Sequence, residues 1–225
     1  RNRKHVIGER PLMKVSTIIP AYNEEIRIIS VLDPISKSSL IKEIFVIDDG
    51  SQDRTSLIVS DYSSKYDNIK LIKLPQNRGK AEAIKVGLQY CNCEIILFLD
   101  ADLIGLTVGH IESLVLPLLK EDVEMTIGIF KSGRFLTNLA QKIAPNLSGQ
   151  RAFRNYFKND ILNLDMSGYS LEVAVSKYIK KNNIKTKEIL LRDVSHVMKE
   201  EKVGLIKGMI WRFRMYKDIL KYWFK

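Results

Sequence analysis

Two carboxylates, separated by a single residue, follow a run of apolar side chains. The run Ile95–Leu99 ends in Asp100, Ala101 and Asp102. Such a run predicts a buried strand, and open α/β sheets bind ligands at the carboxyl ends of their strands. Paired carboxylates suit Mn²⁺ or Mg²⁺ shared with a diphosphate, because these hard cations take oxygen ligands and leave positions for a substrate. The alternative is that both aspartates cap the helix that follows.

Polar clusters also follow two earlier β-branched runs. Pro20–Glu24 is the first cluster and Asp48–Ser51 the second. Because the carboxyl ends of parallel strands meet at one edge of a sheet, all three clusters are expected to line one crevice. A fourth segment, Asn77–Lys80, opens a helix, where Lys80 and backbone N–H groups could hold a phosphate or carbonyl oxygen. The alternative for this segment is an N-terminal cap with a solvated lysine.

The elements that position these residues alternate between strand and helix. Strands are predicted at 15–19 (closed by Pro20), 44–47, 69–74, 95–100, 125–130 and 186–191; helices are predicted at 23–32, 53–66, 79–90, 107–120, 170–181 and 207–225. The first helix is expected to be capped by Asn23–Glu25, and residues 131–164 show a less regular pattern. Short connections between alternating strands and helices predict a parallel, three-layer α/β domain.

Composition narrows the class of protein. A chain of 225 residues can bury one substantial core, and no segment reads as a linker between domains. Cys91 and Cys93 are the only cysteines, which excludes a disulfide framework. Two cysteines at this spacing also make a poor zinc site, so we expect reduced thiols. We find no apolar run of membrane-spanning length and no signal-peptide pattern, and we therefore expect a cytoplasmic protein.

The net charge of +10 is concentrated near the C-terminus. Residues 177–225 hold fourteen Lys or Arg and five Asp or Glu, a local charge of +9. Within them, residues 207–225 have aromatic and aliphatic side chains at helical spacing between basic ones, a pattern that fits the surface of an anionic membrane. The alternative is that residues 207–225 pack their apolar face on the domain, since the same pattern also fits that role. Charge alone also motivates a nucleic-acid-binding protein, although the paired aspartates have no role there.

Four segments together resemble, in order and spacing, the glycosyltransferase family 2 enzymes of the GT-A fold. These segments are Ser16–Glu25, Val46–Asp53, Asn77–Ala83 and Phe98–Leu103. The resemblance implies a GT-A type (Rossmann-like) three-layer α/β/α domain with a mostly parallel central sheet. It also implies a metal-dependent enzyme that uses a nucleotide-sugar donor such as a UDP- or GDP-hexose.

By the same resemblance, the donor pocket is lined by residues from all four segments. They are Pro20, Ala21, Tyr22, Asn23, Glu24, Asp49, Ser51, Lys80, Asp100, Ala101 and Asp102. Asp100 and Asp102 would flank the diphosphate. Asp102 is the expected direct ligand of Mn²⁺ or Mg²⁺ and is counted among the catalytic residues.

The second half of the chain is similar to glucosyl-3-phosphoglycerate synthases and polyprenyl-phosphate sugar transferases in residues 168–172 and at His196. This resemblance implies that Glu172 lies near the donor sugar or acceptor hydroxyl as a catalytic residue, and that His196 is a metal ligand. Glu172 is alternatively a carboxylate facing a helix dipole, and His196 a histidine in a helix-capping region.

Residues 147–154 look like the acceptor-side loop of the family. Arg151, expected to be catalytic, and Arg154 could clamp an acceptor phosphate or form a solvated basic face. The chain lacks the Gln-x-x-Arg-Trp element of processive polysaccharide synthases. A polymer-extruding synthase is therefore not expected.

We expect one domain over residues 1–225. Its parts are an N-terminal extension (1–13), a nucleotide-sugar-binding half (14–104), an acceptor half (105–198) and a basic amphipathic tail (199–225). The expected function is transfer of a hexose to a phosphorylated or lipid-linked acceptor, in the cytoplasm or at the inner face of the membrane, without nucleic acid as a partner. A non-catalytic sugar-nucleotide-binding module is the alternative, and a homodimer is left open.

Overall fold

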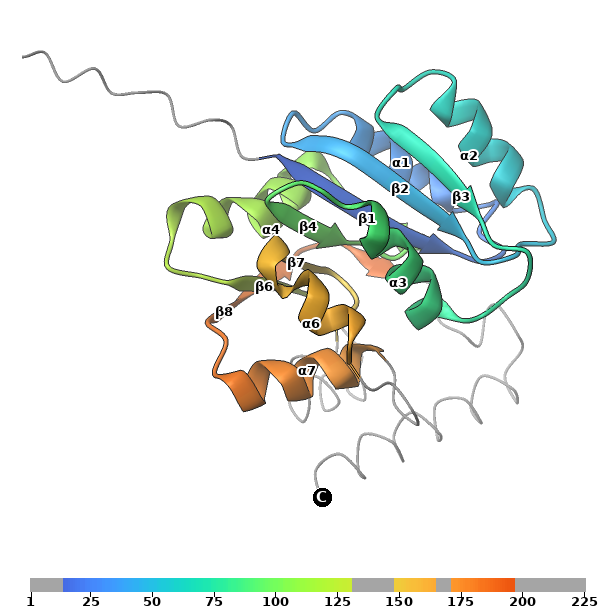
Figure 1. The fold of residues 1–225 in the computed structure, drawn as a ribbon. Helices are drawn as coiled ribbons and strands as arrows, with labels where there is room; N and C mark the ends of the chain where they lie inside the picture. The colour runs from blue at the N-terminus through green and yellow to red at the C-terminus, as the bar shows by residue number, and fades with distance from the viewer. Residues whose placement is uncertain (1–13, 131–147, 165–170, 197–225) are drawn as a thin grey trace, which may run out of the picture.

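The computed structural model describes residues 14–130, 148–164 and 171–196, with the side chain of His196 excepted (Figure 1). The strands are β1 (Val15–Ala21), β2 (Ile41–Asp48), β3 (Ile69–Lys73), β4 (Ile95–Phe98), β5 (Leu103–Ile104), β6 (Met125–Phe130), β7 (Arg151–Arg154), β8 (Thr186–Leu191) and β9 (Ser195–His196). The helices are α1 (Ile28–Ser36), α2 (Thr55–Ser63), α3 (Lys80–Tyr90), α4 (Val108–Lys120), α6 (Lys158–Leu162) and α7 (Leu171–Asn182), with a 3₁₀ turn at Asn155–Phe157.

Seven strands form the central sheet in the order β3-β2-β1-β4-β7-β6-β8. Neighbouring strands pair in parallel except where β7 lies between β4 and β6, and β7 is antiparallel to both. A two-stranded sheet of β5 and β9 lies apart from it. The expectation of a mostly parallel sheet is confirmed.

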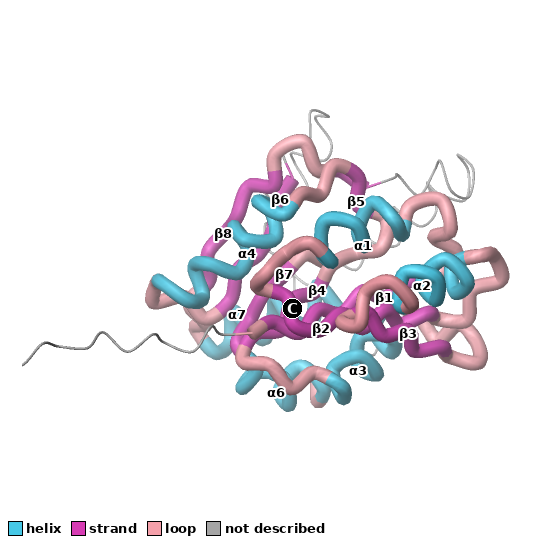
Figure 2. Tube along the Cα trace, turned by 90° about the horizontal axis from the view of Figure 1, so that it is seen from above, coloured by secondary structure: helices cyan, strands magenta, loops and turns pink. Residues whose placement is uncertain are grey.

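Helices cover both faces of the sheet, and a hydrophobic core lies on each side. One core joins the buried faces of α1, α2 and α4 to the strands, and the other joins α3, α6 and α7. Figure 2 shows α1 and α4 on one side of the strands and α3 and α6 on the other. The strands read as continuous apolar runs because both of their faces are buried. The three-layer α/β/α architecture is therefore confirmed.

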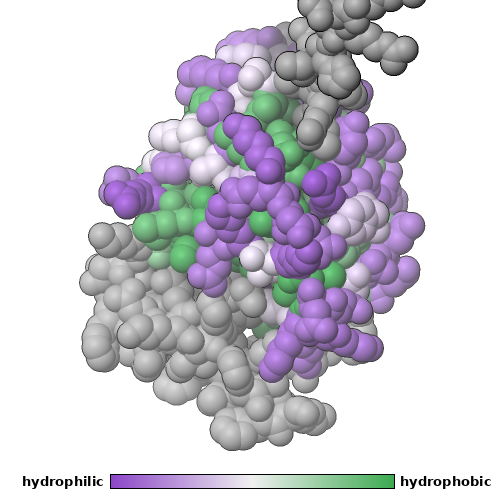
Figure 3. Space-filling view, turned by 90° about the vertical axis from the view of Figure 1, so that its left-hand side faces the viewer, coloured by the Kyte–Doolittle hydropathy of each residue, from purple (hydrophilic) through white to green (hydrophobic). Residues whose placement is uncertain are grey.

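The carboxyl ends of β1, β2 and β3 point to the same end of the molecule (Figure 1). The face at the opposite end has mostly hydrophilic side chains on its described surface, with apolar ones between them (Figure 3). In the part of the chain that the structure describes, every helix is too short or too polar to cross a bilayer.

Several local predictions were wrong. The first helix begins at Ile28, not at 23, because Asn23 has a left-handed backbone (φ 55°) and is not its cap. Strand β1 continues through Pro20 to Ala21. Asp100 and Asp102 do not cap a helix, since β5 follows them and α4 is capped by Thr107, whose Oγ1 accepts a hydrogen bond from the His110 N–H.

The segment expected to be an acceptor-side loop ends as a strand. Residues 151–154 form β7, and a 3₁₀ turn and α6 follow where an irregular region was expected. The predicted helix at 207–225 and the extension at 1–13 lie outside the described residues. The division of the domain into a donor half and an acceptor half stays a prediction.

Candidate active site

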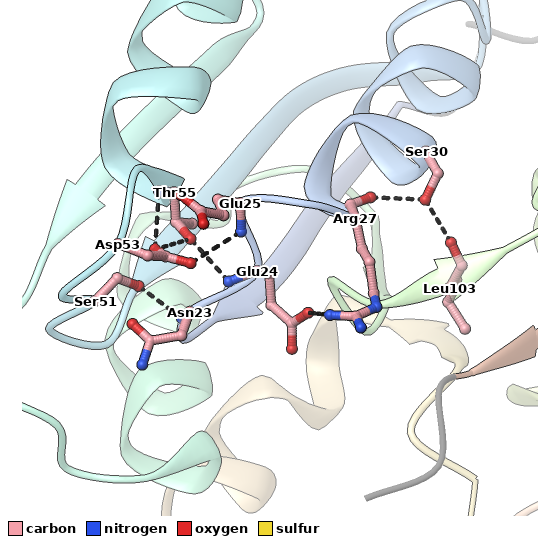
Figure 4. Close-up of polar contacts among 9 residues, drawn as sticks. All are labelled: Asn23, Glu24, Glu25, Arg27, Ser30, Ser51, Asp53, Thr55 and Leu103. Atoms are coloured by element: carbon pink, nitrogen blue, oxygen red, sulfur yellow. Dashed lines mark hydrogen bonds and ion pairs between the residues drawn. The ribbon is translucent and has the colours of Figure 1, made fainter. Parts of the chain in front are cut away.

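The loop that follows β1 is joined to the loop that follows β2 by backbone N–H groups (Figure 4). The Asn23 N–H donates to Ser51 Oγ at 3.0 Å, and the Glu24 N–H donates to Thr55 Oγ1 at 2.8 Å. In return, Asn23 Oδ1 accepts from the Gln52 N–H at 2.8 Å. The two predicted clusters therefore form one surface, as the shared strand edge requires.

Asp53 strengthens this junction, although it was not among the site residues predicted from the sequence. Its carboxylate accepts hydrogen bonds from the Glu25 N–H and from both the N–H and the hydroxyl of Thr55. Burial acts to raise the pKa of Asp53, but the bonds from Thr55 and Glu25 outweigh it and lower that pKa. Asp53 thus holds the loop as a charged carboxylate.

Asp49 joins the second loop to the start of α3. Its two carboxylate oxygens accept the N–H groups of Arg78 and Gly79, each at 2.8 Å, and the side chain is buried. In the same loop Asp48 accepts the Ser51 N–H at 2.9 Å. Asp49 was expected to line the nucleotide pocket, and in this structure it positions the two residues that precede α3.

Lys80, the first residue of α3, lies between two carboxylates. Its Nζ is 2.6 Å from Asp100 Oδ1 and 2.7 Å from Glu172 Oε1. The three residues come from the start of α3, the segment that follows β4 and the first turn of α7. Neither the solvated-lysine alternative for Lys80 nor a purely helix-facing role for Glu172 describes this arrangement.

The electrostatics of this cluster keep Lys80 charged. Burial alone would lower the pKa of Lys80, but the carboxylates of Asp100 and Glu172 outweigh it, and the pKa is raised above its usual value. About a third of the lysine side chain remains exposed. The Lys80 side chain is therefore partly open to solvent, while its ammonium lies between the two carboxylates.

Gly149 and Gln150 cover the cluster from the segment that precedes β7. A Cβ added at Gly149 would lie 2.7 Å from both Lys80 Nζ and Asp100 Oδ2, so a larger residue there would have to displace the ends of these two side chains. Gln150 Nε2 donates to Asp100 Oδ2 at 2.9 Å. Neither residue was among the site residues predicted from the sequence. Their place in the acceptor-side motif, beside Arg151, was the one available signal.

Arg151 is buried against backbone and is not part of a solvated basic face. Its Nε donates to the Ser148 carbonyl at 2.8 Å, and its Nη2 lies 3.4 Å from both the Glu172 carbonyl and Ser176 Oγ. Burial lowers the pKa of Arg151 to about 10, partly opposed by Glu172, so the guanidinium stays charged at neutral pH. A small pocket is lined by Lys80, Phe98, Ser148, Gly149, Arg151, Leu171, Glu172 and Val175.

Arg154 lies away from this cluster. It is opposite Ile95 at the start of β4, whereas Arg151 is opposite Phe98 at its end. Its guanidinium donates to the Leu118 carbonyl of α4. This arrangement does not support the predicted clamp on an acceptor phosphate at Arg154.

The predicted metal ligands are brought to one region by β5 and β9. Asp102 precedes Leu103, and the backbone of Leu103 pairs with that of His196. His196 is therefore in a strand, and the helix-capping alternative is wrong. Within the described side chains no three His, Cys, Asp or Glu residues converge on a metal position. The donor set nonetheless fits Mn²⁺ or Mg²⁺ in chemistry, since Asp100 and Asp102 supply oxygen ligands at an open strand end.

The remaining predicted pocket residues lie at the same edge. Tyr22 is 43% exposed, while Glu24, beside Arg27 at 3.5 Å, is buried. Ala21 pairs with Asp48 at the ends of β1 and β2, with Pro20 one position earlier in β1. Ala101, which lies between the two aspartates in the sequence, is buried. The structure thus brings the three clusters and Lys80 together.

The family model for glycosyl transferase family 2 matches residues 16–174, which is most of the chain. The chain belongs to glycosyl transferase family 2. The match includes all three strand-end clusters, Lys80, and the segment from Gly149 to Glu172. The sheet order and the two helical layers described above are those of the GT-A fold.

Curated members of family 2 are similar to the chain over part of their length. A dolichyl-phosphate beta-glucosyltransferase of Trichomonas vaginalis (ALG5D) is 34% identical over 134 residues, 54% of this chain and 40% of its own length. The human dolichyl-phosphate beta-glucosyltransferase is 38% identical over 108 residues, 43% of this chain and 33% of its own length. The matched segments thus span two fifths or less of these curated relatives.

Among solved structures, glucosyl-3-phosphoglycerate synthase from Mycobacterium tuberculosis has a similar fold. Its complex with phosphoglyceric acid superposes with a TM-score of 0.72 at 20% identity, covering 93% of this chain and 80% of that one. Its complex with Mn²⁺, UDP-glucose and phosphoglyceric acid gives a TM-score of 0.69 at 22% identity, covering 92% and 80%. This likeness supports the GT-A fold.

Proposed function

We propose that the protein transfers a hexose from a nucleoside-diphosphate sugar to a phosphorylated or lipid-phosphate acceptor, in a metal-dependent reaction. The observation that carries this proposal is the cluster of Lys80, Asp100 and Glu172, in which a partly exposed lysine side chain lies at the ligand-binding edge of the sheet. Lys80 would bind the diphosphate of the donor by a charge-assisted hydrogen bond. The curated relatives named dolichyl-phosphate beta-glucosyltransferases support a glucose donor.

We expect Asp100 and Asp102 to hold Mn²⁺ or Mg²⁺, with His196 as a third ligand. The glucosyl-3-phosphoglycerate synthase structures contain Mn²⁺ or Mg²⁺ together with UDP, which favours the same cations here. When bound, the metal offsets the negative charge of the departing nucleoside diphosphate. The junction formed by Asn23, Glu24 and Ser51 would hold the nucleotide beside it.

In the transfer, an acceptor oxygen forms a bond to the anomeric carbon as the bond from that carbon to the diphosphate breaks. A hydroxyl acceptor needs a base to take its proton, whereas a phosphate attacks as an anion. Glu172 lies 2.7 Å from the Lys80 ammonium, so its carboxylate is already paired with a cation. This contact favours a phosphate acceptor, with Glu172 orienting Lys80 and Arg151 supplying nearby positive charge.

We further propose that residues 207–225 contact an anionic membrane surface, which would bring the enzyme to a lipid-phosphate acceptor. The support is the basic amphipathic pattern of that segment. Co-sedimentation with vesicles that contain anionic lipid tests this contact. We expect binding that weakens with salt and is lost when residues 207–225 are removed. Light scattering of the full chain tests the open question of a homodimer.

Calorimetric titration of UDP and GDP, with and without Mn²⁺, tests the donor site. We expect metal-dependent binding of one nucleotide and its loss in Asp102→Ala. Absence of nucleotide binding under every metal condition would refute the transferase. A labelled hexose supplied as UDP-glucose should then appear on a polyprenyl phosphate. Nucleotide binding without transfer to any phosphorylated acceptor would favour the non-catalytic sugar-nucleotide-binding alternative.

A further inference from the structure

Gln150 touches the candidate metal ligand Asp100 from a buried position. Its side-chain Nε2 donates to Asp100 Oδ2 at 2.9 Å, while Asp100 Oδ1 is 2.6 Å from Lys80 Nζ. Both carboxylate oxygens of Asp100 are therefore held by named partners, one on each side. A carboxylate held in this way has little freedom to rotate about its own bonds.

The backbone of Gln150 is fixed as firmly as its side chain. Its N–H donates to Ser148 Oγ at 3.2 Å, and its carbonyl accepts the Gly128 N–H of β6 at 2.8 Å. The residue is 1% exposed and lies directly before β7 in the sheet. The central sheet therefore fixes the position of Gln150, and the Gln150 side chain in turn holds Asp100.

The oxygen of the Gln150 amide, Oε1, is in an unfavourable environment. In the described part of the chain, Gln150 Oε1 is buried without a hydrogen-bond partner. Rotating the amide by 180° would turn that oxygen toward Asp100 Oδ2, where two acceptors would repel. The amide is therefore fixed with its donor on Asp100, although an unpaired buried acceptor destabilises the fold. An apolar side chain of the same length would remove that cost.

We propose that Gln150 is a positioning residue that fixes the Asp100 carboxylate for binding of the metal and the donor diphosphate. This inference rests on the proposed function of the site. Partners outside the ligand shell fix the direction of metal ligands, and losing one commonly weakens metal affinity by about tenfold or more. If Gln150 had only a structural role, replacing it would instead lower the stability of the fold.

The decisive variant is Gln150→Met, which keeps the length of the side chain and removes both amide atoms. We expect a melting temperature equal to or above that of the wild type, because the unpaired Oε1 is gone. Affinity for UDP with Mn²⁺ by calorimetry, and for Mn²⁺ by electron paramagnetic resonance, should fall roughly tenfold or more. Thr126→Val is the matched control, since it removes another buried donor, 2.7 Å from the Leu114 carbonyl. That variant should lose stability and keep its affinity.

Crystal structures of the wild type and Gln150→Met without nucleotide give a readout that does not depend on the donor. We expect one orientation of the Asp100 carboxylate in the wild type and a displaced or divided one in the variant. An unchanged Asp100 together with unchanged affinity would overturn the positioning role, as would a loss of affinity that only parallels a loss of stability. If the wild type binds no nucleotide, the proposed function fails, and the crystal comparison alone then decides whether Gln150 positions Asp100.

Discussion

At the scale of single residues, Lys80 connects the central sheet to α7 through two ion pairs. It contacts Asp100 in the segment that follows β4 and Glu172 at the start of α7. Lys80→Met should weaken binding of the nucleotide with Mn²⁺ by roughly tenfold to a hundredfold, the usual value of a hydrogen bond to a charged group. Lys85→Met on the same helix is the control, because its 3.5 Å pair with Glu82 is on the surface. Equal effects of the two variants on calorimetric affinity would exclude a special role for Lys80.

Gly149 leaves no room for a side chain above the ion pair. An added Cβ would meet Lys80 Nζ and Asp100 Oδ2, both at 2.7 Å, and both atoms are at the ends of side chains that can move. Gly149→Ala should therefore displace the Lys80–Asp100 pair while changing the melting temperature little. We expect nucleotide affinity to fall about tenfold, as when a group around a metal ligand is lost. A variant with wild-type affinity would show that the pair can shift without consequence.

At the scale of secondary-structure elements, the packing of α3 on β1 sets the position of Lys80. A Cβ added at Gly87 would lie 2.7 Å from Ile18 Cγ2 in the core. Overpacking in Gly87→Ala should lower the free energy of unfolding by about 1–3 kcal/mol. The higher helix propensity of alanine should offset this loss by roughly 1 kcal/mol. Gly109→Ala in α4 is the matched control, since its Cβ would meet nothing closer than Thr107 Oγ1 at 3.8 Å. Urea unfolding should show the first variant less stable than the wild type and the second at least as stable.

At the scale of the whole molecule, the buried thiols make folding sensitive to alkaline pH. Burial raises the pKa of Cys91 to about 12, despite a hydrogen bond with Ser16 that acts the other way. An unfolded thiol titrates near 8.5, so between about pH 8.5 and 12 only the unfolded state loses this proton. The free energy of unfolding should then fall by up to about 1.4 kcal/mol per pH unit from this residue, while below pH 8 the contribution is constant.

Chemical unfolding of the wild type and Cys91→Ala between pH 7 and 10 checks this prediction. The wild type should lose more stability than the variant as pH rises, so the two curves converge. Parallel curves would mean that the thiol ionises equally well in the folded protein. Cys93, whose pKa burial also raises, remains in both proteins and contributes equally to each curve.

The local pattern of the sequence determined most of the architecture and the main parts of the site. Apolar runs of strand length predicted the parallel strands, and β6 and β8 have the predicted bounds. The polar clusters at strand ends could be placed at one edge because parallel strands must end there. These inferences depend on residues that are close together in the sequence, so they can be made without the tertiary structure.

The tertiary structure alone decided how the two halves meet. β7 has four residues with an arginine at each end, and it is a strand because it pairs with β4 and β6. Asp100 meets Gln150, fifty residues away, and Lys80 meets Glu172, ninety-two residues away. No periodicity marks contacts at that separation, since they arise only when the sheet brings its strands side by side. The chemistry of the site could therefore be expected from residue types, but which carboxylate each polar group holds was settled by packing.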